Sequence, residues 1–132
     1  MRLTIYTDGG ARGNPGPAAI GVVIYDNKEK IKEFKKCIGI ATNNQAEYTA
    51  MIKAFELAKD LKAKELKVYS DSELLIRQVT GEYRVKNEKL KELFSKLKSL
   101  EKNFTVSYEH VFRENPGIVN ADRLVNEALD GV

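Results

Sequence analysis

The chain has 132 residues, of which 42% are hydrophobic and 31% charged, and its net charge at pH 7 is +3. These values predict one globular domain, residues 1–132, with a sizeable core. No apolar run is long enough to span a membrane, no signal-peptide pattern opens the chain, and the single Cys37 excludes an internal disulfide. We expect a cytoplasmic monomer with no membrane partner and no obligatory protein partner, whose mild basicity is compatible with a polyanion.

The first stretch combines a predicted strand with a bare loop. Leu3–Asp8 alternates apolar with polar or aromatic residues and predicts a strand that ends at Asp8. Residues 9–17 are so rich in glycine and proline that we expect neither strand nor helix there. A carboxylate at the end of a buried strand, beside such a loop, is where an α/β fold places chemistry. A hairpin turn at Asp8-Gly9 is disfavoured, because the turn-forming run is longer than a hairpin needs.

The other elements are predicted from periodicity and turn residues. Residues 18–25 are almost wholly apolar, as in a strand buried on both faces, and the lysines of 30–40 suit an exposed edge strand. In chain order the remaining predictions are a helix at 46–61, a strand at 66–70, helices at 72–80 and 88–102, a strand at 105–112 and a helix at 121–129.

The order of these elements predicts the topology of the sheet. Three strands joined by short turns form an antiparallel meander, and the first helix then returns the chain so that the fourth strand runs parallel to the first. Short, right-handed connections place it beside the first strand. Asp8 and Asp71 would then end neighbouring parallel strands about 4.8 Å apart, where their carboxylates could share one cation.

Two further acids open predicted helices. Glu47 follows Asn44 in the first turns of one helix, and Asp122 follows Asn120 at the start of the last. Each acid also has a structural explanation: Asn44 with Glu47 as a capping box, Asp71 as a helix N-cap, and Asp122 as a favourable charge at a helix dipole. The combination favours a joint site, because two of the acids end neighbouring strands and are not explained as unrelated caps.

The chain resembles a type 1 ribonuclease H over nearly its whole length. The resemblance is carried by four motifs in order: TDGG with GNPGP within 7–17, TNNQAE at 42–47, YSDS at 69–72 and ADRL at 121–124. It implies an α/β ribonuclease H-like fold with a five-stranded mixed sheet, three strands antiparallel and then two parallel, flanked by helices. It also implies endonucleolytic cleavage of the RNA strand of an RNA–DNA hybrid, which leaves 5′-phosphate and 3′-hydroxyl ends.

The resemblance further implies that Asp8, Glu47, Asp71 and Asp122 are catalytic and bind two Mg²⁺ ions, for which Mn²⁺ could substitute. Such ions explain why acids suffice for this reaction. One ion activates a water for attack on the phosphodiester, and the other stabilises the departing 3′-oxygen. Magnesium prefers oxygen ligands and retains several waters, so a few carboxylates and a substrate phosphate complete its shell.

Substrate contacts are also implied by the resemblance. Backbone groups near Gly9, Ala11 and Asn14, with the side chains of Asn43 and Asn44, would read the 2′-hydroxyls of the RNA. An asparagine amide suits this role because it both donates and accepts. Thr42 and Asn87 match the family's pocket for a DNA phosphate, although Asn87 also suits a helix N-cap.

Three features depart from the family pattern. Only residues 81–86 join the two middle helices, where many members carry a long basic insertion. No histidine lies in 113–120, so Arg113 or Glu114 would stand in for the histidine of other members, and we assign Arg113 to substrate binding. Glu73 replaces a common glutamine. The lone His110 is predicted to be structural, and the lysines of the second long helix are expected on a solvated face; these are Lys89, Lys91, Lys96 and Lys98.

Two rival functions stay open at this point. The first is a nucleic-acid-binding module on the same fold with weak or lost cleavage, which the four retained acids disfavour because clustered carboxylates repel phosphate without metal. The second is another polynucleotidyl transferase or a nuclease for DNA junctions, which Asn43 and Asn44 disfavour because they suit RNA recognition.

Overall fold

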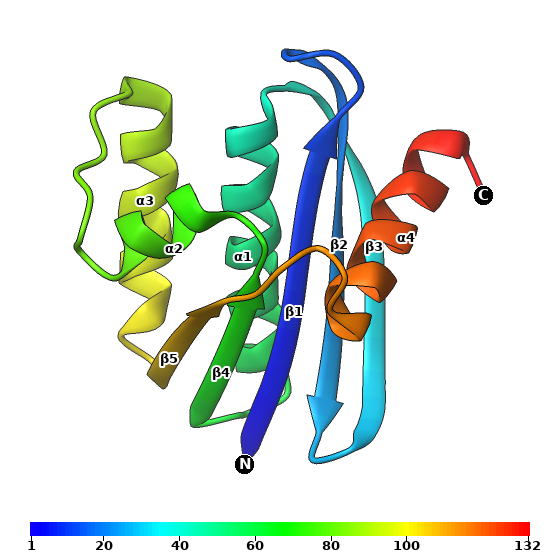
Figure 1. Ribbon diagram of the computed structural model, residues 1–132. Helices are drawn as coiled ribbons and strands as arrows, with labels where there is room; N and C mark the ends of the chain where they lie inside the picture. Colours follow the sequence, from blue (N-terminus) through cyan, green and yellow to red (C-terminus); the bar gives the residue numbers. More distant parts are fainter.

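A mixed five-stranded sheet in the order β3-β2-β1-β4-β5 forms the centre of the computed structural model, which describes residues 1–132. Helices α1, α2 and α3 lie on one side of the sheet and α4 covers part of the other (Figure 1). The elements are β1 (Arg2–Ala11), β2 (Gly16–Asp26), β3 (Glu29–Ala41), α1 (Asn43–Asp60), β4 (Glu65–Ser70), α2 (Glu73–Val79), α3 (Glu88–Glu101), β5 (Thr105–His110) and α4 (Pro116–Asp130). No helix has both the length and the apolar character that crossing a bilayer requires.

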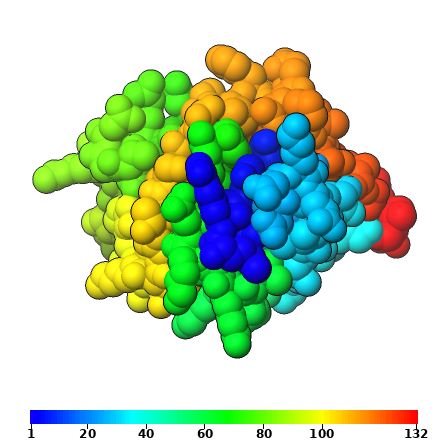
Figure 2. Space-filling model, turned by 90° about the horizontal axis from the view of Figure 1, so that it is seen from below, coloured from blue at the N-terminus to red at the C-terminus, as the bar shows by residue number.

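The predicted topology is confirmed. β1 pairs antiparallel with β2 and β2 with β3, whereas β4 lies parallel beside β1 and β5 parallel beside β4. At the end opposite the β1–β2 loop, the N-terminus lies between the β2–β3 turn and the start of β4 (Figure 2). There the carbonyl of Met1 accepts hydrogen bonds from the backbone N–H groups of Lys64 and Glu65.

The prediction that the first strand ends at Asp8 is wrong. β1 continues to Ala11, because Gly9, Gly10 and Ala11 pair with residues 20, 19 and 18 of β2. Tertiary pairing therefore overrides the turn-forming composition, and the loop shortens to residues 12–15. Asp8 lies inside the central strand rather than at its end.

Helix starts also differ from the prediction. α4 begins at Pro116 with Asn115 as its N-cap, so Asp122 lies in the second turn rather than the first. The box at the start of α1 is formed by Thr42 and Gln45, not by Asn44 and Glu47. Ser72, not Asp71, caps α2. Glu47 and Asp71 are therefore not explained as helix caps.

The main core lies between the sheet and helices α1 and α3. β2 is buried on both faces as predicted: Val22 and Ile24 join the core under α1, and Val23 contacts α4. β3 is the exposed edge strand. The expectation that Lys98 lies on a solvated face is wrong, because its ammonium donates to the carbonyl of Val79 and lies near the rings of Phe94 and Tyr108.

The backbones of β1 and α1 are closest at Gly9. A Cβ atom added there would lie 2.3 Å from the carbonyl carbon and oxygen of Ala46 and 2.6 Å from the nitrogen of Glu47. These are backbone atoms of a helix, which cannot move aside cheaply. At Gly10 the nearest atom to such a Cβ is Cγ1 of Val125, at an ordinary 3.7 Å.

We therefore expect Gly9→Ala to lower the free energy of unfolding by about 3 kcal/mol, at the upper end of overpacking costs. Gly10→Ala is the matched control and should change it by less than about 1 kcal/mol. Urea unfolding followed by circular dichroism measures both. Equal effects of the two substitutions would contradict the close-approach explanation.

Candidate functional site

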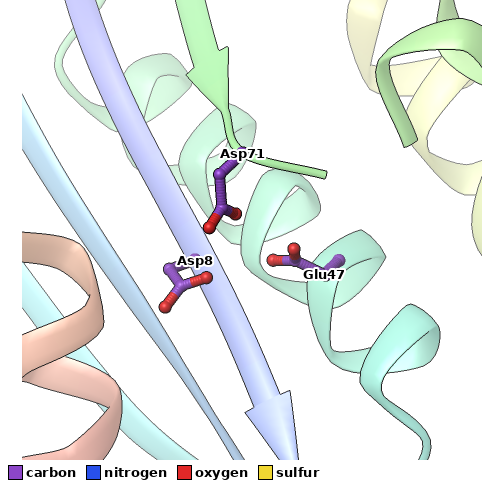
Figure 3. Close-up of side chains that lie close together, drawn as sticks. All are labelled: Asp8, Glu47 and Asp71. Atoms are coloured by element: carbon purple, nitrogen blue, oxygen red, sulfur yellow. The ribbon is translucent and has the colours of Figure 1, made fainter. Parts of the chain in front are cut away.

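Three carboxylates converge beside the central strand. Asp8 comes from β1, Asp71 directly follows β4, and Glu47 lies in the early part of α1 (Figure 3). One oxygen of each lies within 4.8 Å of the others. The predicted adjacency of Asp8 and Asp71 follows from the parallel pairing of β1 with β4, whose last partners are Tyr6 and Tyr69.

The position of Glu47 depends on Gly9. The backbone N–H of Gly9 donates to Oε1 of Glu47 at 2.7 Å, in a buried hydrogen bond between β1 and α1. The missing Cβ of Gly9 lets α1 approach closely enough for this bond to form. The carboxylate is thereby held beside Asp8, which precedes Gly9 in the strand.

Asp122 approaches the same place from α4. It lines one hollow with the other three acids, but it is exposed and does not belong to the group within 4.8 Å. Its charge is close enough to raise the pKa of Asp8, together with burial and the charge of Asp71. The structure thus places all four predicted acids around one space, three of them tightly.

The hollow measures about 370 Å³ and is lined mostly by polar groups. The predicted residues Gly9, Ala11, Asn43, Asn44 and Arg113 line it. Sequence reasoning missed several others, which are Gly10, Arg12, Ser72, Val125, Asn126 and Leu129. The α4 residues among them could have been found, because they recur at three- and four-residue spacing from Asp122 and so share its helix face.

Burial and mutual repulsion dominate the electrostatics. Desolvation, followed by the charges of Asp71 and Asp122, raises the pKa of Asp8 to about 8. Burial and the charge of Asp8 raise the pKa of Glu47 well above its usual range, against the opposing hydrogen bond from Gly9. Burial also raises the pKa of Asp71, despite a nearby arginine.

That arginine is Arg113, whose Nε lies 4.0 Å from Oδ2 of Asp71. Its side chain is 87% exposed, so water screens most of its charge. His110 lies beside the same acid, with Nε2 3.2 Å from the backbone carbonyl of Asp71, in line with the predicted structural role. The His110 ring lies edge-on to that of Phe112, with the ring centroids 5.4 Å apart, although Phe112 is 75% exposed.

Asn14 and Asn43 bond within the protein. The side-chain oxygen of Asn43 accepts from the backbone N–H of Ala11 at 2.8 Å, and the backbone N–H of Asn43 donates to Oδ1 of Asn14 at 3.0 Å. The β1–β2 loop is thereby fastened to the start of α1. Asn44 makes no side-chain hydrogen bond to the protein, although it lines the hollow.

Thr42 and Asn87 lie outside the hollow. Each is a helix N-cap: Thr42 accepts from the N–H of Gln45 and Asn87 from that of Leu90. Both helices, α1 and α3, begin at the same end of the molecule as the β1–β2 loop (Figure 1). The predicted capping role of Asn87 is confirmed.

The donor set at the hollow fits a hard cation. Carboxylates that repel one another, with raised pKa values and no buried cationic side chain, form a site that a divalent ion would neutralise. All the candidate ligand atoms are oxygens, which Mg²⁺, Mn²⁺ and Ca²⁺ accept.

Comparison with known proteins places this geometry in a family. Residues 6–128 match the family described as reverse transcriptase-like. The ribonuclease HI of Halobacterium salinarum is 40% identical over 131 residues, covering 98% of the chain and 65% of that protein. The chain belongs to the ribonuclease H family. The bifunctional protein Rv2228c of Mycobacterium tuberculosis is 41% identical over 133 residues, and there the chain spans only 36% of the relative's length.

Solved ribonuclease H structures confirm the fold. A crystal structure of RNase H1 from Halobacterium salinarum matches all of both chains with a TM-score of 0.95 at 39% identity. LC11-RNase H1, crystallised in complex with an RNA/DNA hybrid, matches 98% of this chain and 97% of its own with a TM-score of 0.92 at 44% identity. The five-stranded mixed sheet and flanking helices are therefore those of a type 1 ribonuclease H.

The raised pKa of Asp8 predicts a pH-dependent stability without metal. Because its pKa is about 8 in the folded state against 3.8 ordinarily, the folded protein keeps a proton that the unfolded chain releases, and stability is lost as the pH rises through this range. Asp8→Asn mimics the protonated form. We expect it to raise the melting temperature at pH 8 in EDTA by about 4 °C or more, roughly 1 kcal/mol, and to have little effect near pH 4.

Thermal unfolding in EDTA across this pH range provides the measurement. Asp60→Asn, at an exposed acid at the end of α1, is the control and should leave the pH profile unchanged. An Asp8→Asn profile parallel to that of the wild type would show that this carboxylate carries no trapped proton.

Proposed function

We propose that the chain is an endoribonuclease that hydrolyses the RNA strand of RNA–DNA hybrids. The observation that carries the proposal is the convergence of Asp8, Glu47 and Asp71 in one hollow, bordered by the Gly9–Ala11 backbone and the asparagines that open α1. The similar LC11-RNase H1, which was crystallised with an RNA/DNA hybrid, supports the choice of substrate.

Asp8, Glu47, Asp71 and Asp122 are the residues that would hold two Mg²⁺ ions, with Mn²⁺ as a substitute. When bound, the ions supply activation of the attacking water and neutralisation of charge on the departing 3′-oxygen, so that the products carry 5′-phosphate and 3′-hydroxyl ends. The residues must be ionised to do this. Protons compete for Asp8 and Glu47, whose pKa values are raised, so metal affinity should fall as the pH falls.

Recognition of RNA would depend on the groups that border the acids. The Asn44 amide has no partner in the protein, so its donor and acceptor are both available to a 2′-hydroxyl. The side-chain oxygen of Asn43 accepts from Ala11 and so links the β1–β2 loop to α1. The NH₂ group of Asn43 remains available to the substrate. Arg113, largely exposed at the edge of the hollow, offers a phosphate contact.

The DNA strand would contact the starts of α1 and α3. Asn87 uses only its carbonyl oxygen as a cap, so its NH₂ group remains free to donate to a phosphate. Thr42 opens α1, where helix N–H groups and the dipole favour an anion. The helices that these two residues cap begin at the same end of the molecule as the β1–β2 loop (Figure 1), where Ala11 and Arg12 line the hollow, and this suits one duplex spanning both.

The first test is cleavage of labelled substrates. With Mg²⁺, the wild type should cut the RNA of a hybrid but neither duplex DNA nor duplex RNA, and EDTA should stop the reaction. Asp71→Asn should slow cutting at least about 10²-fold, because the amide lacks the negative charge with which Asp71 would hold a metal ion. Hybrid binding in EDTA should persist or improve in this variant, since a phosphate-repelling charge is lost. Binding without any cutting by the wild type would instead support a nucleic-acid-binding module.

The second test separates recognition from stability. Asn44→Ala should slow hybrid cleavage about tenfold, the value of one hydrogen bond near 1.4 kcal/mol, with an unchanged melting temperature. Asn43→Ala should slow cleavage and also lower the melting temperature, because the bond from Ala11 is lost. Normal cleavage by both variants would assign these residues to structure alone.

A further inference from the structure

Asp122 lacks the supports that hold Asp8 and Glu47. Asp8 and Glu47 are buried, and Glu47 also accepts from the backbone of Gly9. Asp122 is exposed on one turn of α4 and would be free to rotate into solvent. An aspartate that must meet a cation at a fixed place needs another group to orient it.

The side chain of Asn126 donates a hydrogen bond to the Asp122 carboxylate. It lies one turn further along α4, and its Nδ2 donates to both Oδ2 of Asp122 at 3.3 Å and the backbone carbonyl of Asp122 at 3.1 Å. One amide group therefore bonds both the carboxylate of Asp122 and the backbone of the helix turn that carries it. Because the amide is neutral, it orients the Asp122 carboxylate without cancelling its charge. A lysine or arginine in its place would cancel that charge.

The other end of the Asn126 amide is held by Arg12. Nη2 of Arg12 donates to Oδ1 of Asn126 at 3.4 Å, and Nη1 lies 2.6 Å from Oδ1 of Asp130. Asp122, Asn126 and Asp130 are four residues apart in succession and so share one face of α4. Arg12 comes from the β1–β2 loop, so this chain of contacts joins that loop to the acid.

We propose that Asn126 is a positioning residue that orients Asp122 toward the metal site, and that Arg12, anchored by Asp130, fixes the orientation of the Asn126 amide. The inference rests on the proposed function, because it assigns Asp122 a cation to bind. It adds two residues that act through Asp122 and would not themselves bind the cation. Residues near the two ends of the chain thus share the task of completing the site.

The test is the affinity of the whole protein for Mn²⁺ without substrate, measured by isothermal titration calorimetry. Asn126→Leu keeps the approximate size of the side chain but loses both hydrogen bonds. It should weaken Mn²⁺ binding about tenfold, the lower bound for residues that orient metal ligands. The Mg²⁺ concentration for half-maximal cleavage should rise similarly, whereas the rate at saturating Mg²⁺ should change much less. A smaller loss in the same direction is expected for Arg12→Met, which leaves the Asn126 donor in place.

Glu127→Gln provides the matched control on the next residue of α4. Glu127 pairs with Lys35 and Arg123 and does not line the hollow, so its loss should affect melting temperature but not Mn²⁺ affinity. If Asn126→Leu bound Mn²⁺ like the wild type while Asp122→Asn bound it weakly, the positioning role would be refuted and the metal site would stand. If the wild type failed to bind Mn²⁺, or Asp122→Asn bound it normally, the assignment of Asp122 as a ligand would itself be wrong.

Discussion

The site depends on the close contact between the backbone of β1 and that of α1 at Gly9. Because no side chain separates them, the N–H of the strand reaches the carboxylate of Glu47 in the helix. The same strand carries Asp8 one residue earlier. It also pairs with β4, and Asp71 directly follows β4. One strand therefore sets the relative positions of three acids: it carries Asp8, its backbone N–H binds the Glu47 side chain, and its pairing with β4 places Asp71.

This arrangement concentrates negative charge where water is scarce. Burial and repulsion raise the pKa values of Asp8, Glu47 and Asp71 together, and Arg113, whose Nε lies 4.0 Å from Asp71, is mostly in solvent. Such a cluster costs stability in the metal-free protein, which the core beneath α1 and the sheet must offset. A bound cation would relieve this repulsion, so the instability of the metal-free cluster and the proposed binding of metal have one physical origin.

Much of this could be predicted from the sequence because it depends on local pattern. Apolar periodicity predicted the elements, and their order placed Asp71 beside Asp8. Errors arose where contacts with another segment determine the local structure. Gly9–Ala11 forms strand only because β2 pairs with it. Asn126 and Arg12 could not be paired in advance, because the contact between them joins residues 114 apart in the sequence. Pro116 could have revealed the start of α4, since proline favours the first turn of a helix.

The spread of the four acids along the chain has a consequence for biosynthesis. The β1–β2–β3 meander is built from neighbouring segments and can pair early, whereas the parallel contact of β1 with β4 closes a loop of some sixty residues and Asp122 arrives still later. A chain emerging from the ribosome therefore cannot bring all four carboxylates together until its last helix is in place. The repulsion among all four arises only when the last helix docks, so the acidic site is complete only once α4 has folded.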